Sequence, residues 1–500
     1  MPRNTNKKAI DLRSMRYWGR LAVVVLIAVS LTGCAVFTIN TMDNEQRDPK
    51  TVPNKTRTAL AVTADDLSDE VFIGIALSGG GSRAANFSAA VLLELEHIGI
   101  LQRATALSSV SGSSLPTAYY GLYGTRKDTA RWNPAEVRRQ MRKDFELRWI
   151  GRWFLPQNIL TYWTTNFNRS DIMKEVLDSN LFHGESFAAM GSGRPRILIN
   201  ATSLLKGDRF VFSEEQFQSD LHARVDTFPI ANAVMASSAF PGAFHDMTLK
   251  DYTNANDLDQ EVRDQKRYKH VLDGGPSDNL GTTTLLEMVA QLYRAPRKPK
   301  GCFLIVVDAY PYPQYSEQTR EADTRSMLDF VFDTNVAKAS DAMLTARRTD
   351  LMSDLNVDVR TPNIEPFQPN IGEDSIWPDQ YDADLRADCA VWHLSLQRLL
   401  SDNFARKAAA RSTDPKKDKE ALAKDITNVA QVVNTIPTRY KLKGKDQNNA
   451  ALDTGTLQND LFDAASYLMY LDSDKENVPI LKRVCDWFAD RNIRDLHCSK

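Results

Sequence analysis

Two short apolar runs lie in the first quarter of the chain, a continuous one at residues 71–77 and a second at 106–110 that includes two serines. Each run ends in a turn of small residues, as buried parallel strands often do. Between the runs, residues 82–97 carry apolar side chains at helical spacing, and Gly99 follows as a stop signal. Because the links are short, this pattern predicts a strand, a helix and a second strand joined by a right-handed parallel crossover.

The alternation of apolar runs and helical spacing continues along the chain. Further strands are predicted at 197–201, 270–272 and 303–307. Helical spacing is found at 283–293, 326–351, 420–434 and 456–471. The pattern therefore predicts an α/β domain over residues 71–310, followed by a mainly helical extension over residues 311–500 that packs on it.

The amino terminus has the pattern of an export signal. Six basic residues precede an apolar run at 21–31, which is about half of the ~20 residues that span a bilayer. The run ends in Leu31-Thr32-Gly33-Cys34, which resembles the lipobox of bacterial lipoproteins, whose cysteine is acylated. We therefore expect lipidation at Cys34 and a place in the bacterial cell envelope. A signal anchor with a chance cysteine is the alternative.

Cleavage before Cys34 would remove a signal peptide over residues 1–33 and leave a polar tether over residues 34–70. Ala35 follows the cysteine in place of an aspartate, which in bacterial lipoproteins favours the outer membrane. The remaining chain carries 56 basic and 63 acidic residues. Since neutralising phosphates needs concentrated positive charge, this balance argues against a nucleic-acid partner.

The cysteines agree with export from the cytoplasm. Four remain if Cys34 carries lipid, and an even number permits disulfides, of which Cys485 with Cys498 is the expected pair. Cys302 begins an apolar run, so we interpret it as a small buried hydrophobe. The chain has no CxxC pair and no HExxH helix. The sequence therefore indicates no metal site and no cofactor.

A glycine-rich loop, Gly79-Gly80-Gly81, follows the first strand. Without Cβ atoms its backbone can take positive φ and expose its N–H groups, and the helix that starts near Ser82 adds a positive dipole. Such a loop holds an anion, either an oxyanion or the phosphates of a nucleotide. A dinucleotide site needs an acidic residue at the end of the second strand, and this strand ends in Ser109-Val110-Ser111. The sequence therefore favours an oxyanion hole.

Ser111 lies where the second strand turns into a helix. In such a turn the nucleophile is strained, and the residues two before and two after it must be small. Ser109 and Ser113 meet this requirement. The helix that follows would point its amino end at the serine and favour the alkoxide and the oxyanion. Ser111 is therefore the candidate nucleophile.

Asp273 is the candidate base, since it ends an apolar strand and precedes two glycines. At the carboxyl edge of a parallel sheet its side chain would come close to Ser111. In a dehydrated site a carboxylate can accept the hydroxyl proton directly. An Asx turn at a strand end is the structural alternative for Asp273. A Ser-His-Asp arrangement is the chemical alternative, and it would require His393 or His497.

The three segments together resemble the patatin-like phospholipase family. Gly79-Gly80-Gly81-Ser82-Arg83 matches the family's glycine-rich loop, Ser111 falls at the nucleophile of its G-x-S-x-G elbow, and Asp273-Gly274-Gly275 matches its D-G-G/A motif. The elbow departs from the pattern, because Ser109 and Ser113 replace both glycines. The resemblance covers residues 72–281 and accounts only weakly for the remainder.

This resemblance implies a three-layer α/β/α sandwich with a mainly parallel central sheet. It also implies a serine lipid acyl hydrolase of the phospholipase A or lysophospholipase type, in which Asp273 takes a proton from Ser111 and no metal is needed. The substrate would be a membrane glycerolipid or phospholipid, whose phosphate pairs with Arg83. The oxyanion would be held by the amides of Gly79, Gly80, Gly81 and Gly112.

A cluster of tryptophans precedes the third predicted strand, at Trp132, Trp149, Trp153 and Trp163. Together with Arg148 and Arg152 this composition suits a bilayer interface, and a lid packed on the core is the alternative. Because the elbow is altered, a catalytically silent envelope lipid-binding or scaffold lipoprotein is the alternative to a hydrolase.

Overall fold

The computed structural model describes residues 44–48, 54–253, 267–311, 344–353, 355, 365–366, 388–401, 403–412, 418–446, 448, 450–474 and 476–498. The signal peptide, Cys34 and part of the tether lie outside these residues and stay predictions. The chain divides into two compact units. The smaller comprises Met1–Thr41 and Ile150–Asn168, and the larger comprises Met42–Trp149 and Arg169–Lys500.

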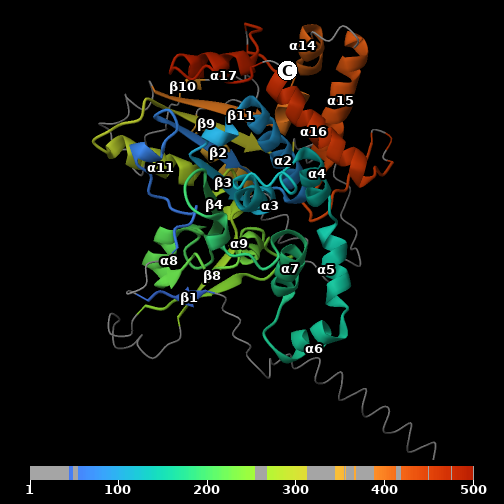
Figure 1. The fold of residues 1–500 in the computed structure, drawn as a ribbon. Coiled ribbons are helices and arrows are strands. Elements are labelled where there is room, and N and C mark those ends of the chain that lie inside the picture. The colour runs from blue at the N-terminus through green and yellow to red at the C-terminus, as the bar shows by residue number, and fades with distance from the viewer. Residues whose placement is uncertain are drawn as a thin grey trace, which may run out of the picture. The chain divides into compact units, whose positions relative to one another are not determined.

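The larger unit contains a nine-stranded sheet among its described residues (Figure 1). The five inner strands run parallel in the order β11 (Cys389–Ser395), β9 (Gly301–Asp308), β2 (Val71–Leu77), β3 (Ala106–Val110) and β4 (Arg196–Ser203). Antiparallel strands complete it: β10 (Glu365–Pro366) beside β11, and β5 (Arg209–Val211), β8 (Tyr268–Asp273) and β7 (Met247–Lys250) beyond β4. A separate pair is formed by β1 (Glu45–Gln46) and β6 (Ala223–Arg224).

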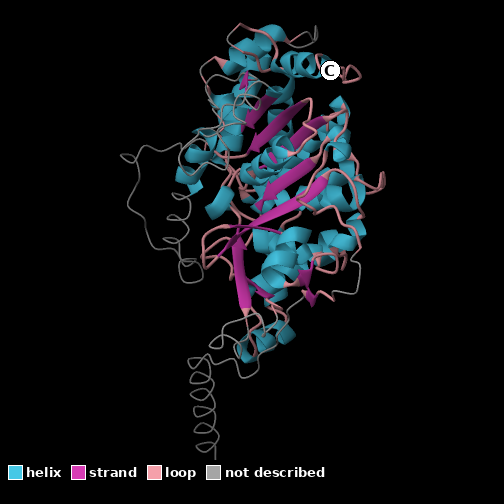
Figure 2. Cartoon of the chain, turned by 90° about the vertical axis from the view of Figure 1, so that its left-hand side faces the viewer, coloured by secondary structure: helices cyan, strands magenta, loops and turns pink. Residues whose placement is uncertain are grey.

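Helices cover both faces of this sheet (Figure 2). Neighbouring residues of a strand face opposite sides, and β9 shows the two layers. Leu304 packs in a core cluster with residues of α11 (Thr282–Arg294). Phe303 instead contacts Phe488 of α17 (Ile480–Ala489), with ring centroids 4.9 Å apart. The predicted α/β fold with helices on both faces of a mainly parallel sheet is thus confirmed.

The remaining helices of the larger unit connect and flank the strands. After β2 comes α2 (Gly81–Ile98), against which α16 (Thr454–Tyr470) packs. The others are α3 (Ser114–Tyr119), α4 (Pro134–Met141), the start of α5 (Phe145–Trp153), α7 (Arg169–Leu177), α8 (Glu214–Leu221), α9 (Ile230–Ser237), α10 (Gly275–Asp278), α14 (Phe404–Arg411) and α15 (Lys419–Thr435).

The sequence pattern missed β11, which lies within the part predicted as mainly helical. Its register pairs Cys389 with Cys302 of β9, so the extension also supplies an inner strand of the sheet. Only the end of the helix predicted at 326–351 is described, and residues 344–353 are helical there.

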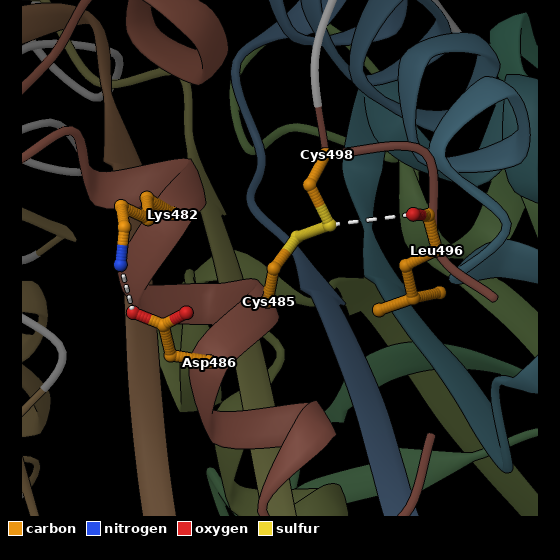
Figure 3. The surroundings of a disulfide bond; sticks show 5 residues. All are labelled: Lys482, Cys485, Asp486, Leu496 and Cys498. Carbon is orange, nitrogen blue, oxygen red and sulfur yellow. Dashed lines mark hydrogen bonds and ion pairs between the residues drawn. A yellow bond between two sulfur atoms is a disulfide. The ribbon is translucent and has the colours of Figure 1, made fainter. Parts of the chain in front are cut away.

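Both pairs of cysteines in the described part of the chain are bonded. Cys302 bonds to Cys389 of the neighbouring strand, so interpreting Cys302 as merely a small buried hydrophobe was wrong. The expected pair Cys485–Cys498 is present and ties the carboxyl-terminal tail to α17 (Figure 3).

The described part of the smaller unit holds the last residues of α5 and all of α6 (Pro156–Thr164). Trp153 and Tyr162 pack with ring centroids 4.9 Å apart. Yet α6 buries none of its side chains. Among the described residues, no helix combines the length and apolar character needed to cross a membrane.

Candidate active site

Ser111 sits in a tight turn directly after β3. Its φ of 53° lies in the left-handed region, which is uncommon for a residue with a side chain and marks local strain. The backbone N–H of Ser111 donates to Ser237 Oγ at 2.9 Å, and Ser237 in turn donates to the Asn200 carbonyl at 2.6 Å. The flanking Ser113 is fully buried and donates to the Ser78 carbonyl. The predicted strand-to-helix elbow, with small residues around it, is therefore present.

The hydroxyl of Ser111 donates a hydrogen bond to Asp273, with 2.7 Å between Oγ and Oδ2. The second carboxylate oxygen, Oδ1, accepts from the backbone N–H of Gly275 at 2.8 Å. Asp273 is 2% exposed and Ser111 is 8% exposed. Two side chains 162 residues apart in the sequence are thus in direct contact.

The strand that carries Asp273 runs differently from the sequence-based expectation. We expected it to be parallel and to end at the same edge as β3, but β8 is antiparallel to β4. It approaches from beyond the carboxyl end of β4 and stops where Asp273 faces Ala201. On the other side of β4, Val110 faces Asn200. Asp273 and Ser111 therefore meet because of where β8 stops along β4.

Burial raises the pKa of Asp273 from 3.8 to about 6, although the hydrogen bonds from Gly275 and Ser111 favour the ionised form. At neutral pH the carboxylate is therefore ionised, and it is more basic than an aspartate in water. A base that has this pKa and already accepts the serine proton in a hydrogen bond is suited to general-base chemistry.

The glycine loop supplies unused N–H groups beside Ser111. Gly80 and Gly81 have φ values of 141° and 59°, which residues with side chains rarely adopt. Gly112 packs so closely that an added Cβ would lie 2.0 Å from the Gly81 carbonyl oxygen. Within the described chain, the N–H groups of Gly80, Gly81 and Gly112 have no hydrogen-bond partner. These three amides are free to bind an oxyanion.

Gly79 has a different role from the one predicted. Its N–H donates to the Asn279 carbonyl at 3.0 Å, so this amide is already used and does not belong to the oxyanion hole. An added Cβ would lie 2.5 Å from Asn279 Oδ1 and 3.3 Å from the Ser111 Cβ. A glycine is needed here because the loop passes so close to Ser111 and Asn279.

A cavity of about 330 Å³ opens onto Ser111, Gly81 and Gly112. Its walls are mostly apolar, with residues from α2, α3, α4, α5 and α7. One wall is aromatic: the ring of Phe244 lies 5.5 Å from that of Trp149 and 5.1 Å from that of Tyr440. The volume falls at the lower end of the ~300–1,000 Å³ found for small-molecule sites. A single slender apolar group suits this space better than a nucleotide.

Residues 436–441, here called the strap, form a part of the cavity that the sequence did not predict. The Arg439 carbonyl accepts the backbone N–H of Ser82 at 2.6 Å, and an added Cβ on Gly81 would lie 2.4 Å from the same oxygen. The buried hydroxyl of Tyr440 donates to the Ser238 carbonyl. Burial, together with the charge of Asp273, raises the pKa of Tyr440. The hydroxyl therefore stays protonated beside Asp273.

Arg83 holds the strap in place. Its side chain is buried, and Nε donates to the Ala309 carbonyl at 2.7 Å while Nη1 donates to the Ile436 carbonyl. Nη2 donates to Thr438 Oγ1 at 3.4 Å. Arg83 does not line the cavity. Because the guanidinium is already bonded to the chain itself, we do not retain Arg83 as a contact to a substrate phosphate.

All seven histidines lie in the described part of the chain, and none lines the cavity. His393 bonds through Nε2 to the buried Asp308 at 3.1 Å. The ring of His497 lies 6.3 Å from that of His97. Neither residue that a Ser-His-Asp arrangement would require is near Ser111. Among the described residues, no cluster of three or more potential metal ligands is present.

Comparison with known proteins agrees with the chemistry of the cavity. Residues 75–286 match the model of the patatin-like phospholipase family, and this range includes Ser111, Asp273 and the glycine loop. None of the curated proteins matches the sequence.

Solved structures of low sequence identity resemble the chain only loosely. Human GIVD cytosolic phospholipase A2 has 13% identity and a TM-score of 0.42. The match covers 83% of this chain and 64% of the human chain. The same human protein in complex with methyl γ-linolenyl fluorophosphonate has 14% identity and a TM-score of 0.40, with coverages of 90% and 70%. VipD from Legionella pneumophila has 13% identity and a TM-score of 0.21, with coverages of 88% and 96%. This chain thus spans less than two thirds of the first of these structures.

Proposed function

We propose that this protein is a serine lipid acyl hydrolase that cleaves carboxylic ester bonds of membrane glycerolipids, of the phospholipase A or lysophospholipase type. The observation that carries the proposal is the 2.7 Å hydrogen bond from Ser111 to the buried Asp273. The bonded pair lies beside three backbone N–H groups without a partner in the described chain, and Ser111 lines an apolar cavity. The family match over residues 75–286 supports the same chemistry.

The reaction follows from the positions of these groups. Asp273 Oδ2 takes the proton of the Ser111 hydroxyl while Oγ attacks the ester carbonyl carbon. The N–H groups of Gly80, Gly81 and Gly112 stabilise the negative charge on the carbonyl oxygen. The protonated Asp273 then returns the proton to the leaving alcohol, and an acyl-enzyme remains on Ser111. A water molecule repeats these steps in the second half and releases the fatty acid.

The cavity supports an acyl group as the bound part of the substrate. Among the residues that line its mostly apolar walls, only Glu146 and Arg439 are charged. These two side chains pair with one another, with 3.8 Å between Arg439 Nη1 and Glu146 Oε1. We therefore place one acyl chain in the cavity and the rest of the lipid outside it.

The proposal is tested by hydrolysis of a phospholipid panel and by labelling with a fluorophosphonate. Wild type should release fatty acid and carry the label on Ser111, and Ser111→Ala should lose both by at least about a thousandfold. Ser82→Ala is the matched control, because Ser82 also lines the cavity but has no base beside it. Labelling that survives in Ser111→Ala would refute the assignment. A folded wild type that neither reacts nor cleaves would favour a lipid-binding scaffold.

From the sequence alone we also propose that Cys34 is acylated and anchors the protein in the cell envelope, in the outer membrane. Mass spectrometry of the mature amino terminus should then show a lipid-modified cysteine after loss of residues 1–33. Cys34→Ser should carry no lipid at this position. A mature chain with an intact amino terminus would contradict this proposal.

A further inference from the structure

Exposed large hydrophobic side chains are concentrated in one short segment. Nine are exposed in the described part of the chain, and seven of them lie between Leu147 and Trp163. Single exposed apolar residues are normal on a protein surface, but a group of them in one segment marks a binding surface. The most exposed members are Phe154 at 69%, Leu160 at 65% and Leu147 at 63%, followed by Trp163 at 51%.

The helix that carries part of this group has no core of its own. None of the nine residues of α6 is buried, although it contains Ile159, Leu160, Tyr162 and Trp163. Helices shorter than about 12 residues are marginal in water unless one face packs on something. An apolar helix of this length with no fully buried side chain therefore needs a partner to cover its exposed apolar residues.

We propose that the exposed residues of the smaller unit, here called the 150–163 surface, dock onto a lipid bilayer. They are Ile150, Phe154, Leu155, Ile159, Leu160 and Trp163. The inference rests on the proposed function, because it explains how an insoluble ester reaches Ser111. It adds a second lipid contact that is separate from the predicted anchor at Cys34.

The composition of the segment identifies the occupant. Residues 147–168 contain Arg148 and Arg152 and no acidic residue. Tryptophan, tyrosine and phenylalanine accompany the aliphatic residues, and this mixture is typical of helices that lie in a membrane interface. The two arginines also complement the negative charge of anionic lipids.

The same segment is connected to the cavity through a single helix. The first turns of α5 place Phe145 and Trp149 in the cavity wall, and the helix ends at Trp153. Trp149 is only 4% exposed, and its indole N–H donates to the Arg169 carbonyl at 3.0 Å. The tryptophan predicted to meet the membrane thus belongs to the acyl cavity, while residues further along the chain provide the docking surface.

The first test compares rates on two substrates. We expect Phe154→Ser/Leu160→Ser to lower hydrolysis of vesicles made of equal parts phosphatidylcholine and phosphatidylglycerol by at least about tenfold. Its kcat/KM on a soluble short-chain ester should stay unchanged. Leu204→Ser/Leu205→Ser is the matched control, because these two residues are also exposed but lie outside the segment. Equal losses in both double variants, or an unchanged vesicle rate, would overturn the proposal.

A second measurement needs no catalysis. In full-length protein carrying Ser111→Ala, brominated acyl chains should quench tryptophan emission more strongly than they do in the same protein with Trp163→Phe added. Equal quenching would overturn the docking surface. So would a native mass that falls from dimer to monomer in Phe154→Ser/Leu160→Ser, which would assign the surface to a second copy. If wild type cleaves no ester at all, the proposed function fails, and the quenching result still decides whether the surface meets lipid.

Discussion

The two sides of the cavity at Ser111 are built in different ways. On one side, Ser111 and the glycine loop lie in turns that directly follow β3 and β2, and each can be recognised from a few neighbouring residues. On the other side, the strap brings in Tyr440, which is 202 residues away from its hydrogen-bond partner Ser238. The positions of Ser111 and the oxyanion-binding amides thus depend on local turns, whereas the space for the substrate depends on a distant segment held by Arg83.

The largest effect should come from removing the base. Asp273→Asn keeps a side chain of the same shape but cannot accept the serine proton, so kcat should fall by about 10³–10⁴-fold, in the upper part of the range for a general base. Steady-state kinetics on a soluble ester provide the measurement, with circular dichroism as the check on folding. A loss of less than tenfold in a folded variant would mean that another group is the base.

The next effect should separate the strap from the catalytic turns. Arg83→Met leaves the carbonyls of Ala309 and Ile436 without their donors, and the free energy of unfolding should fall by about 2–4 kcal/mol. Arg139→Met is the control, since the Arg139 side chain is 64% exposed and its ion pair with Glu136 is worth about 0–1 kcal/mol. Denaturant unfolding measures both variants. Equal losses would show that Arg83 does not anchor the strap.

The raised pKa of Asp273 also predicts a dependence of stability on pH. Folding disfavours the charged carboxylate, so ionised Asp273 costs stability. The cost is absent below about pH 4, grows through pH 6 and is complete above it. Asp273→Asn should therefore be more stable than wild type by at most about 3 kcal/mol at pH 8 and by little at pH 4. A difference that does not change with pH would contradict the assigned pKa.

The smallest effect should concern selectivity for the acyl chain. Tyr440→Ala removes the aromatic ring that packs on Phe244, and kcat/KM for a long-chain ester should fall by about tenfold. The kcat/KM for a short-chain ester should fall much less. Tyr440→Phe keeps the ring and should keep the selectivity for long chains. If Tyr440→Ala lowered kcat/KM equally for both esters, the strap would support the catalytic groups rather than shape the acyl site.

Much of the fold could be predicted because its strands have simple signatures. The run at 71–77 is continuously apolar, the run at 106–110 lies between two turns, and the structure has strands with those same bounds. In contrast, β11 was missed. The long stretch of sequence before it does not show the alternation of apolar runs and helical spacing that marks the other strands. The direction of β8 was also missed, since a short apolar run does not reveal whether its neighbour is parallel or antiparallel.

The candidate site shows the same division. Ser111 and Asp273 were predicted from their turns, and the structure brings them into contact. No motif indicated that the amide of Gly79 donates to the Asn279 carbonyl or that Arg83 donates to the carbonyls of Ala309 and Ile436. These hydrogen bonds join segments that are far apart in the sequence, and no sequence motif links the two segments. Only the long-range packing of the chain determines them.

The most direct test of the Ser111–Asp273 pair is the rate at which a fluorophosphonate modifies Ser111 as a function of pH. In wild type this rate should rise with pH as a single ionisation with a midpoint near the pKa of about 6 and then level off. In Asp273→Asn the reaction should be slow at every pH and show no such midpoint. The same rise in Asp273→Asn as in wild type would contradict the assignment of Asp273 as the base.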